Sequence, residues 1–303
     1  MPETFRALLI PMDLTPISDR VVGRVALLPL AEGARLMLLH VVPKSLPIRA
    51  QRRAERDAKK ALADEAKNLA KTLPESVTVE HVVKVGSPAT EIAACAGSAE
   101  VELIVMGRGG HRALRDVFLG STAERVIRQA QLPVLVVRLP PRAPYRRPAL
   151  ALDLDQAAHE VLALLLRVIP PPRPQVAIIH AFYAPYEGLI YPSLSPDDAE
   201  EYRDRYRRQA IQKLGKLIAT ALAQAKVSPN NAPFWKTDVR YGSPRIIIEK
   251  AIKKADADLL VLGTHGYSGL AHVFLGTVAG DVLRNVACDV LVVPPPRDTS
   301  GTT

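Results

Sequence analysis

Short apolar runs alternate along the chain with longer segments in which apolar residues recur at helical spacing. In the first half the strand-like runs are 5–12, 35–42, 77–85, 102–106 and 133–137. Segments of helical composition separate them, at 18–30, 49–73, 88–96 and from residue 121 onward. Buried strands that alternate with helices are typical of a parallel sheet covered on both faces. The pattern therefore predicts five strands and four helices in a small doubly wound α/β domain.

The second half repeats this alternation. Its strand-like runs are 149–153, 176–182, 235–241, 259–262 and 290–293, and its long helix is expected at about 197–226. We therefore expect two tandem doubly wound domains, each with a five-stranded parallel sheet. The expected boundaries are 1–140 for the first domain, 141–148 for a proline-rich linker, 149–296 for the second domain and 297–303 for a flexible tail.

An internal repeat supports this division. Residues 103–137 match 259–293 at a constant offset of 156, and Gly86-Ser87-Pro88 matches Gly242-Ser243-Pro244 at the same offset. Nearer the start of each copy the offset is 140, since Asp13 matches Asp153. The second copy therefore holds 16 additional residues between its second and third strands.

The strongest chemical signal in each copy is Gly-x-x-Gly, nine further residues, and then Gly-Ser or Gly-Thr. The first copy has Gly107, Gly110, Gly120 and Ser121, and the second has Gly263, Gly266, Gly276 and Thr277. The signature begins at the carboxyl end of a strand and finishes at a helix N-terminus, where backbone N–H groups and the helix dipole favour a phosphate.

A structural alternative exists for the last part of this signature. Ser121 and Glu124 have the spacing of a capping box. The second copy has Gly280 in place of Glu124 yet keeps the glycine and hydroxyl spacing, which favours a ligand. There is no Gly-x-x-x-x-Gly-Lys-Ser/Thr and no Gly-x-Gly-x-x-Gly after the first strand, so P-loop and dinucleotide-binding motifs are excluded.

The motifs together resemble the ATP-binding branch of the universal stress protein family, in a tandem form. The resemblance rests on Ile10-Pro11-Met12-Asp13, His40-Val41-Val42, Gly86-Ser87-Pro88 and the glycine signature. It covers the chain nearly end to end. It implies a Rossmann-like fold of the adenine nucleotide alpha hydrolase type, with ATP, accompanied by Mg²⁺, as the ligand.

The resemblance also implies site residues. In the first copy they are Pro11, Asp13, Val41, Met106, Gly107, Gly110, Gly120, Ser121 and Thr122. Asp13 would contact the ribose or base, Val41 the adenine, and the glycines and hydroxyls the ribose and phosphates. In the second copy the matching residues are Asp153, Ala181, Leu262, Gly263, Gly266, Gly276, Thr277 and Val278. Ala151 replaces Pro11 and Val278 replaces Thr122, so we expect the first site to bind more tightly.

Several polar residues near these motifs have a second interpretation. Asp13 can cap the helix that follows it, and this role is compatible with ligand binding. His40 and His180 end the second strands and are expected to be hydrogen-bonded structural residues. Arg108, Arg112 and Arg115 could reach phosphates in the first copy alone. No residue is assigned a catalytic or metal-binding role, although slow ATP hydrolysis stays open.

Composition narrows the classes of protein and the cellular locations to be considered. The chain has 303 residues, 48% of them hydrophobic, and a net charge of +9. Its basic residues are interleaved with acids and prolines, which favours a solvated surface over a specific nucleic-acid site. Cys95 and Cys288 do not match between the copies, so we expect core thiols and no disulfide framework. No apolar run reaches 18 residues and the N-terminus lacks a signal-peptide layout, so we expect a cytoplasmic protein without a membrane segment.

Two functions remain open on these grounds. The first is an ATP-binding regulator or protector in the stress response. The second is a scaffold that binds no nucleotide and acts through protein–protein contacts. If the apolar last strands, 133–137 and 289–293, lie at sheet edges, they are exposed templates for pairing. The resemblance to the family implies that they pair with each other within the chain, and a homodimer of such chains is left open.

Overall fold

The structure is a computed structural model that describes residues 4–109, 121–154, 158–184, 194–264 and 275–295. Its first half contains β1 (Phe5–Pro11), α1 (Pro16–Val25), β2 (Leu30–Pro43), α2 (Ile48–Ala70), β3 (Thr78–Gly86), α3 (Pro88–Ser98), β4 (Leu103–Gly107), α4 (Ser121–Gln129) and β5 (Val134–Val137). Its second half contains β6 (Pro148–Ala151), α5 (Ala158–Val168), β7 (Val176–Phe182), α7 (Pro196–Gln224), a 3₁₀ turn (Pro229–Asn231), β8 (Trp235–Tyr241), α8 (Pro244–Ala255), β9 (Leu259–Gly263), α9 (Thr277–Asn285) and β10 (Asp289–Val293).

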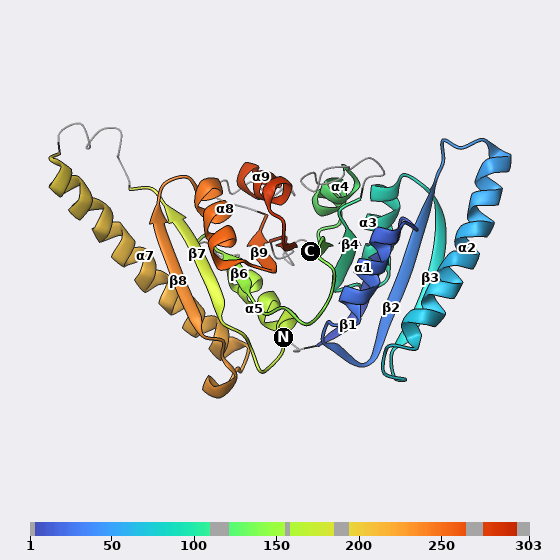
Figure 1. Cartoon of the computed structure of the whole chain (residues 1–303), viewed down its shortest axis with the longest axis horizontal. Helices are drawn as coiled ribbons and strands as arrows, with labels where there is room; N and C mark the ends of the chain where they lie inside the picture. The colour runs from blue at the N-terminus through green and yellow to red at the C-terminus, as the bar shows by residue number, and fades with distance from the viewer. Residues whose placement is uncertain (1–3, 110–120, 155–157, 185–193, 265–274, 296–303) are drawn as a thin grey trace, which may run out of the picture.

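The strands form one continuous ten-stranded sheet in the order β3-β2-β1-β4-β5-β10-β9-β6-β7-β8. All pairs within each half are parallel, as the alternation of strands and helices predicts. The halves meet where β5 and β10 pair antiparallel, with Leu135 opposite Leu291. Figure 1 shows the two halves side by side, with α2 and α7 at opposite outer ends. The α/β fold class is confirmed.

Helices cover both faces of this sheet. One hydrophobic cluster packs α1, α2, α5 and α7 against one face, with Val21, Leu62 and Leu214 among its members. A second cluster packs α3, α4, α8 and α9 against the other face, with Ile92 and Leu283 among its members. Full burial of each such side chain contributes about 1.5–3 kcal/mol to folding. Both faces are covered, which explains why the strands are apolar throughout rather than alternating.

The first helix ends earlier than its composition predicts. The sequence predicts a helix over 18–30, whereas α1 ends at Val25 and the chain enters β2 at Leu30. Pro29 explains the difference because a proline disfavours helical backbone at the residue before it. Leu30 instead pairs with Phe5, which extends β2 by five residues beyond the predicted start at 35.

The segment that joins the halves packs against both of them. The side chain of Tyr145 is only 5% exposed, and its hydroxyl donates a hydrogen bond of 2.7 Å to Asp289 Oδ2 at the start of β10. The Arg24 guanidinium of α1 lies 4.0 Å from the centre of the Tyr145 ring. Arg24 also donates to the carbonyl oxygen of Ala143 at 2.9 Å. The proline-rich joining segment is therefore held in a single path between α1 and β10.

In a second set of contacts between the halves, the arginine comes from the second half and its partners come from the first. Arg167 of α5 lies 3.1 Å from Glu102 Oε2 and donates to the carbonyl oxygen of Thr4 at 2.9 Å. Its guanidinium also lies 4.2 Å from the centre of the Phe5 ring. Arg167 therefore connects the second half to a carboxylate of the first half.

Candidate functional site

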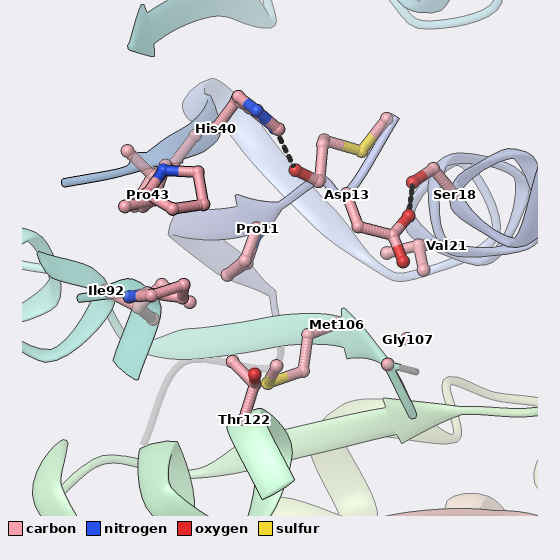
Figure 2. A pocket seen from close by; sticks show the side chains of 15 residues that line it. Pro11, Asp13, Ser18, Val21, His40, Pro43, Ile92, Met106, Gly107 and Thr122 are labelled. Carbon is pink, nitrogen blue, oxygen red and sulfur yellow. Dashed lines mark hydrogen bonds between the residues drawn. The ribbon is translucent and has the colours of Figure 1, made fainter. Parts of the chain in front are cut away.

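A cleft of about 410 Å³ opens at the carboxyl ends of β1, β2 and β4 in the first half. Its lining residues are Pro11, Met12, Asp13, Ser18, Val21, Leu39, His40, Val41, Pro43, Pro88, Ile92, Met106, Gly107, Gly109 and Thr122. Figure 2 shows side chains from β1, β2, α3, β4 and α4 directed toward one space. This is the place where open α/β sheets bind ligands, and a cleft of this volume suits a small molecule.

Six of the predicted site residues line this cleft together. They are Pro11, Asp13, Val41, Met106, Gly107 and Thr122. Gly110 and Gly120 lie outside the described residues, as does the side chain of Ser121, although Ser121 is the first residue of α4. The predicted first site is therefore assembled at one place as far as the structure describes it.

The walls of the cleft are mostly apolar. Val41 is 9% exposed and Met106 is 4% exposed, so each presents only a small area to the opening. Ile92, on the first turns of α3, is also buried and lines the cleft. Apolar walls of this kind favour a flat, weakly polar ring over a fully charged ligand.

Asp13 is fixed by the start of α1. Its Oδ1 accepts hydrogen bonds from the Thr15 backbone N–H at 3.1 Å, the Thr15 hydroxyl at 2.7 Å and the Ser18 hydroxyl at 2.8 Å. Figure 2 draws the Ser18 bond beside the cleft. Asp13 is not the helix cap itself, because the N-cap residue is Thr15 and its side chain makes no capping bond; Asp13 instead binds the Thr15 N–H and two hydroxyls at the helix start. The same bonds also hold the carboxylate in a defined orientation at the rim of the cleft.

His40 and His180 play the structural role expected of them. Nδ1 of His40 lies 2.8 Å from the carbonyl oxygen of Met12, and Nδ1 of His180 lies 2.8 Å from that of Leu152. A carbonyl oxygen can only accept, so Nδ1 carries the proton in both rings. Each histidine thereby ties the end of the second strand of its half to the residue before the site aspartate.

Sequence reasoning missed several residues of the cleft. Ser18 lies in the first turn of α1, and its hydroxyl donates to Asp13 Oδ1. A serine five residues after the site aspartate was the signal in the sequence that could have identified it. Pro88 is the last residue of the repeated Gly-Ser-Pro, a motif that the sequence reveals but does not place in the site, and Ile92 follows it on α3. Gly109 has a φ of +68°, a left-handed conformation that glycine adopts most readily.

The second half has a different set of residues at the equivalent positions. Ala158 and Val278 stand where the first half has Ser18 and Thr122, so both hydroxyls are absent. Asp153 accepts a hydrogen bond from the Leu154 backbone N–H at 2.9 Å. Tyr183 replaces Pro43 and is 58% exposed. The equivalent region is therefore less polar inside and carries an aromatic ring at its edge.

The predicted residues of the second copy lie at the ends of their strands. Leu262 and Gly263 finish β9, while Ala181 lies near the end of β7. Gly276 donates its N–H to the Thr264 carbonyl oxygen at 3.0 Å, directly before α9 begins at Thr277. Gly266 lies outside the described residues. This one backbone hydrogen bond therefore joins the residue after β9 to the residue before α9.

Glu124 binds arginines from both halves. Its carboxylate lies 2.9 Å from Arg128 of its own helix and 3.5 Å from Arg284 of α9. At the position matching Glu124, the second half has Gly280, and a Cβ there would lie 3.2 Å from Arg284 Nη2. The Glu124 carboxylate therefore links α4, which carries Thr122 of the cleft, to the other half of the protein.

Within the residues that the structure describes, no group of three or more His, Cys, Asp and Glu side chains is arranged to hold a metal ion. Among the described helices, none combines the length and the apolar character needed to cross a bilayer.

Comparison with known proteins gives a consistent result. The profile of the universal stress protein family matches residues 4–138 and again 144–294. A universal stress protein of Mycolicibacterium smegmatis is 28% identical over 250 residues, covering 80% of this chain and 78% of that protein. Universal stress protein Sll1388 of Synechocystis is 31% identical over 157 residues, which are 49% of this chain and 97% of that protein.

Solved structures agree on the fold. The crystal structure of a universal stress protein from Archaeoglobus fulgidus superposes with a TM-score of 0.67 at 18% identity, covering 95% of this chain and 98% of that one. At this identity the likeness establishes the fold, and the two profile matches establish a tandem arrangement of the family's domain.

Proposed function

Because the chain belongs to the universal stress protein family, we propose that its first half binds ATP and that the protein acts as a nucleotide-dependent regulator or protector in the stress response. The observation that carries this proposal is the cleft of about 410 Å³ at the carboxyl ends of β1, β2 and β4. It combines apolar walls with a small number of polar groups, which is the usual composition of a site for a nucleoside.

Different lining residues would contact the adenine, the ribose and the phosphates of the ligand. Val41 and Met106 supply the apolar surface for adenine. The Asp13 carboxylate, already oriented by Thr15 and Ser18, supplies an acceptor for ribose hydroxyls. The N-terminus of α4 with Thr122 supplies N–H and hydroxyl donors for phosphate. Gly110, Gly120 and Ser121 belong to this phosphate end by resemblance, and Mg²⁺ would be held by phosphate oxygens.

The second half supports the same proposal in a weaker form. It keeps the glycines Gly263 and Gly276 with Thr277 and Asp153, but Ala158 and Val278 remove two hydroxyls. In the first half the Thr122 hydroxyl is the proposed donor to the ligand, whereas the Ser18 hydroxyl holds Asp13 in place; the loss of each such bond costs about 0.5–1.5 kcal/mol. We therefore assign the tighter nucleotide site to the first half.

The proposal makes ATP a ligand that changes the state of the protein. A ligand that binds the folded state alone stabilises it by RT ln(1 + [L]/Kd), about 2.7 kcal/mol at 100 times Kd. Regulation follows if one conformation binds ATP better than another. Hydrolysis, if it occurs, would be slow, since we assign no nucleophile or general base at the cleft. A cytoplasmic location and a homodimer are part of the same proposal.

An exchange of residues between the halves tests the proposal. ATP, ADP, AMP and cAMP are each titrated, with Mg²⁺, into the full chain by calorimetry, and the nucleotide released from denatured protein is identified by chromatography. The variant Ser18→Ala/Thr122→Val gives the first half the residues of the second. We expect its ATP affinity to fall by a factor of about ten to one hundred.

The reverse exchange, Ala158→Ser/Val278→Thr, is the matched control and should leave the tight site unchanged. If the unmodified protein binds no adenine nucleotide and gains no thermal stability with Mg-ATP, the scaffold function becomes the better explanation. If only the reverse exchange changes the tight site, the assignment to the first half is wrong.

A further inference from the structure

The outer helix α2 carries an unusual concentration of positive charge. Six cations occur within twelve residues, and all six side chains are exposed: Arg49, Arg52, Arg53, Arg56, Lys59 and Lys60. At 100° per residue they fall within an arc of about 120° on the helix surface. The buried residues of α2, which include Ala58 and Leu62, lie on the other side against the sheet. The six cations therefore form one continuous basic face directed to solvent.

Few acidic groups neutralise this face. Asp57 lies 3.7 Å from Arg53, and both side chains are more than 70% exposed, so this pair is weak. Glu55 accepts a hydrogen bond from Gln51. Among the residues that the structure describes, the other five cations of the basic face form no ion pair. Most of its charge is available to an external anion.

The equivalent helix of the second half also carries arginines, at 203, 205, 207 and 208, but acids are interleaved with them and Arg207 lies 3.3 Å from Asp204. The first turn of α7 contains Asp197 and Asp198, and Ser195 caps it by accepting the Asp198 N–H at 3.2 Å. The first turn of α2 has no acidic residue, and Pro47 precedes it without a side-chain cap. Cations near a helix N-terminus oppose the helix dipole and weaken the helix. Helix stability therefore does not account for the basic face of α2.

The surroundings of the basic face favour one kind of polyanion. An amphipathic helix that binds a membrane inserts an apolar face next to its basic one, but the apolar face of α2 is packed on the sheet through Leu62 and Leu69. Exposed large apolar side chains occur beside the basic face only at the start of α2, where Leu46 and Ile48 are 37% and 68% exposed, and among the described residues none continues along the helix. A row of cations that extends beyond so small an apolar area suits a line of phosphates. We propose that the basic face of α2 binds the phosphate backbone of nucleic acid, without reading base sequence.

Binding of this kind has a measurable signature. Each phosphate contact releases counterions, so log K falls with log salt concentration by about 0.9 for each contact on duplex DNA. Six contacts would give a slope of roughly −5, and three would give roughly −3. The position of α2 at the outer end of the sheet leaves this face open to a long ligand (Figure 1).

The test uses the full chain and a fluorescein-labelled 24-base-pair DNA duplex, measured by anisotropy from 50 to 200 mM salt. The variant Arg49→Gln/Arg52→Gln/Arg56→Gln keeps good helix formers and is expected to bind at least tenfold more weakly, with a shallower salt slope. Arg49→Lys/Arg52→Lys/Arg56→Lys keeps the charge and should retain binding. A duplex of unrelated sequence should bind equally well to the unmodified protein.

The matched control removes the same charge from α7. Arg205, Arg208 and Lys213 are exposed, so Arg205→Gln/Arg208→Gln/Lys213→Gln alters the net charge equally without touching α2. Equal weakening by both triple variants would show a general charge effect and overturn the proposal. So would an absence of duplex binding at 50 mM salt, or binding to vesicles containing phosphatidylserine without binding to DNA. Circular dichroism confirms that each variant is folded.

Discussion

Arg24 on α1 and Asp289 at the start of β10 form an ion pair between the two halves of the chain. Arg24 Nε lies 3.3 Å from Asp289 Oδ2, and the side chains are only 4% and 0% exposed. Asp289 Oδ1 also accepts the backbone N–H groups of Arg138 and Leu139 at 2.7 and 2.8 Å. A buried carboxylate of the second half is thereby supplied with a countercharge and backbone donors that all come from the first half.

Removal of Arg24 should destabilise the whole molecule. Arg24→Leu leaves the Asp289 carboxylate buried without its countercharge, and breaking a buried pair in this way typically costs 3–5 kcal/mol. We expect a loss of that size in the free energy of unfolding, measured with urea at pH 8. Arg167→Leu is the comparison, since its partner Glu102 is 27% exposed and can be hydrated. Equal small losses in both variants would contradict this account.

The loss caused by Arg24→Leu should depend on pH. Burial raises the pKa of Asp289 above its ordinary value, so the folded protein binds this proton more tightly than the unfolded chain does. Stability from such a group is present at low pH and is lost as pH rises through the folded pKa. The deficit of Arg24→Leu should therefore be smaller at pH 5 than at pH 8. A deficit that grows on acidification would show that Asp289 does not control it.

The Tyr145 hydroxyl should make the protein sensitive to alkali. Burial, and then the nearby Asp289 charge, raise the pKa of Tyr145 well above its ordinary value of 10.0. Stability is then complete below about pH 10 and declines above it as the unfolded chain ionises first. Tyr145→Phe should lower the melting temperature at pH 8, because it removes the bond to Asp289. Between pH 8 and pH 10.5, however, the melting temperature of this variant should fall by less than that of the unmodified protein. Parallel losses would refute a role for Tyr145.

A charge at the central strand pair should separate the halves. Val136 is fully buried and pairs with Val290 across the antiparallel junction. Val136→Lys would bury an unpaired ammonium group there, so we expect a larger radius of gyration by small-angle scattering, or loss of solubility. Thr78→Lys introduces the same charge on the exposed start of the outer strand β3 and should change neither. An unchanged radius for Val136→Lys would count against a firm junction.

Two glycines of the second half should respond to alanine in opposite directions. Gly280 lies within α9; a Cβ there would come closest to the flexible end of Arg284, at 3.2 Å, and would make an ordinary contact with the Leu275 side chain at 3.7 Å. Because glycine weakens a helix interior by about 1 kcal/mol, we expect Gly280→Ala to stabilise the protein by up to that amount. At Gly276 a Cβ would lie 3.2 Å from the Thr264 backbone oxygen, so Gly276→Ala should destabilise it. Thermal unfolding of the two variants provides the measurement.

The sequence alone predicts much of the fold because each strand and helix has a clear local pattern. The repeat then places Asp13 and Val41 near strand ends and Thr122 at a helix start, and one cleft brings them together. The start of β2 was missed, since the effect of Pro29 and the pairing of Leu30 with Phe5 override the composition of that segment.

Contacts between the halves were the least predictable. Arg24 and Asp289 are far apart in the sequence, and neither position is repeated with its charge, since Leu164 and Pro133 occupy the matching places. The link between Glu124 and Arg284 likewise depends on how α4 and α9 meet. Ser18 was missed because its part in the cleft depends on its bond to Asp13 rather than on a motif.

The single Arg24–Asp289 pair has a consequence for how this architecture can diverge. In a symmetric dimer of two identical chains, the two-fold axis would repeat every such ion pair, so the pair would occur either twice or not at all. Here a short tether holds the halves at a high effective concentration, so each always meets the same neighbour. A substitution in one half can then be matched by a different one in the other. Covalent fusion thereby allows each half to change independently, and the different residues at the first cleft and at its equivalent positions in the second half are consistent with this.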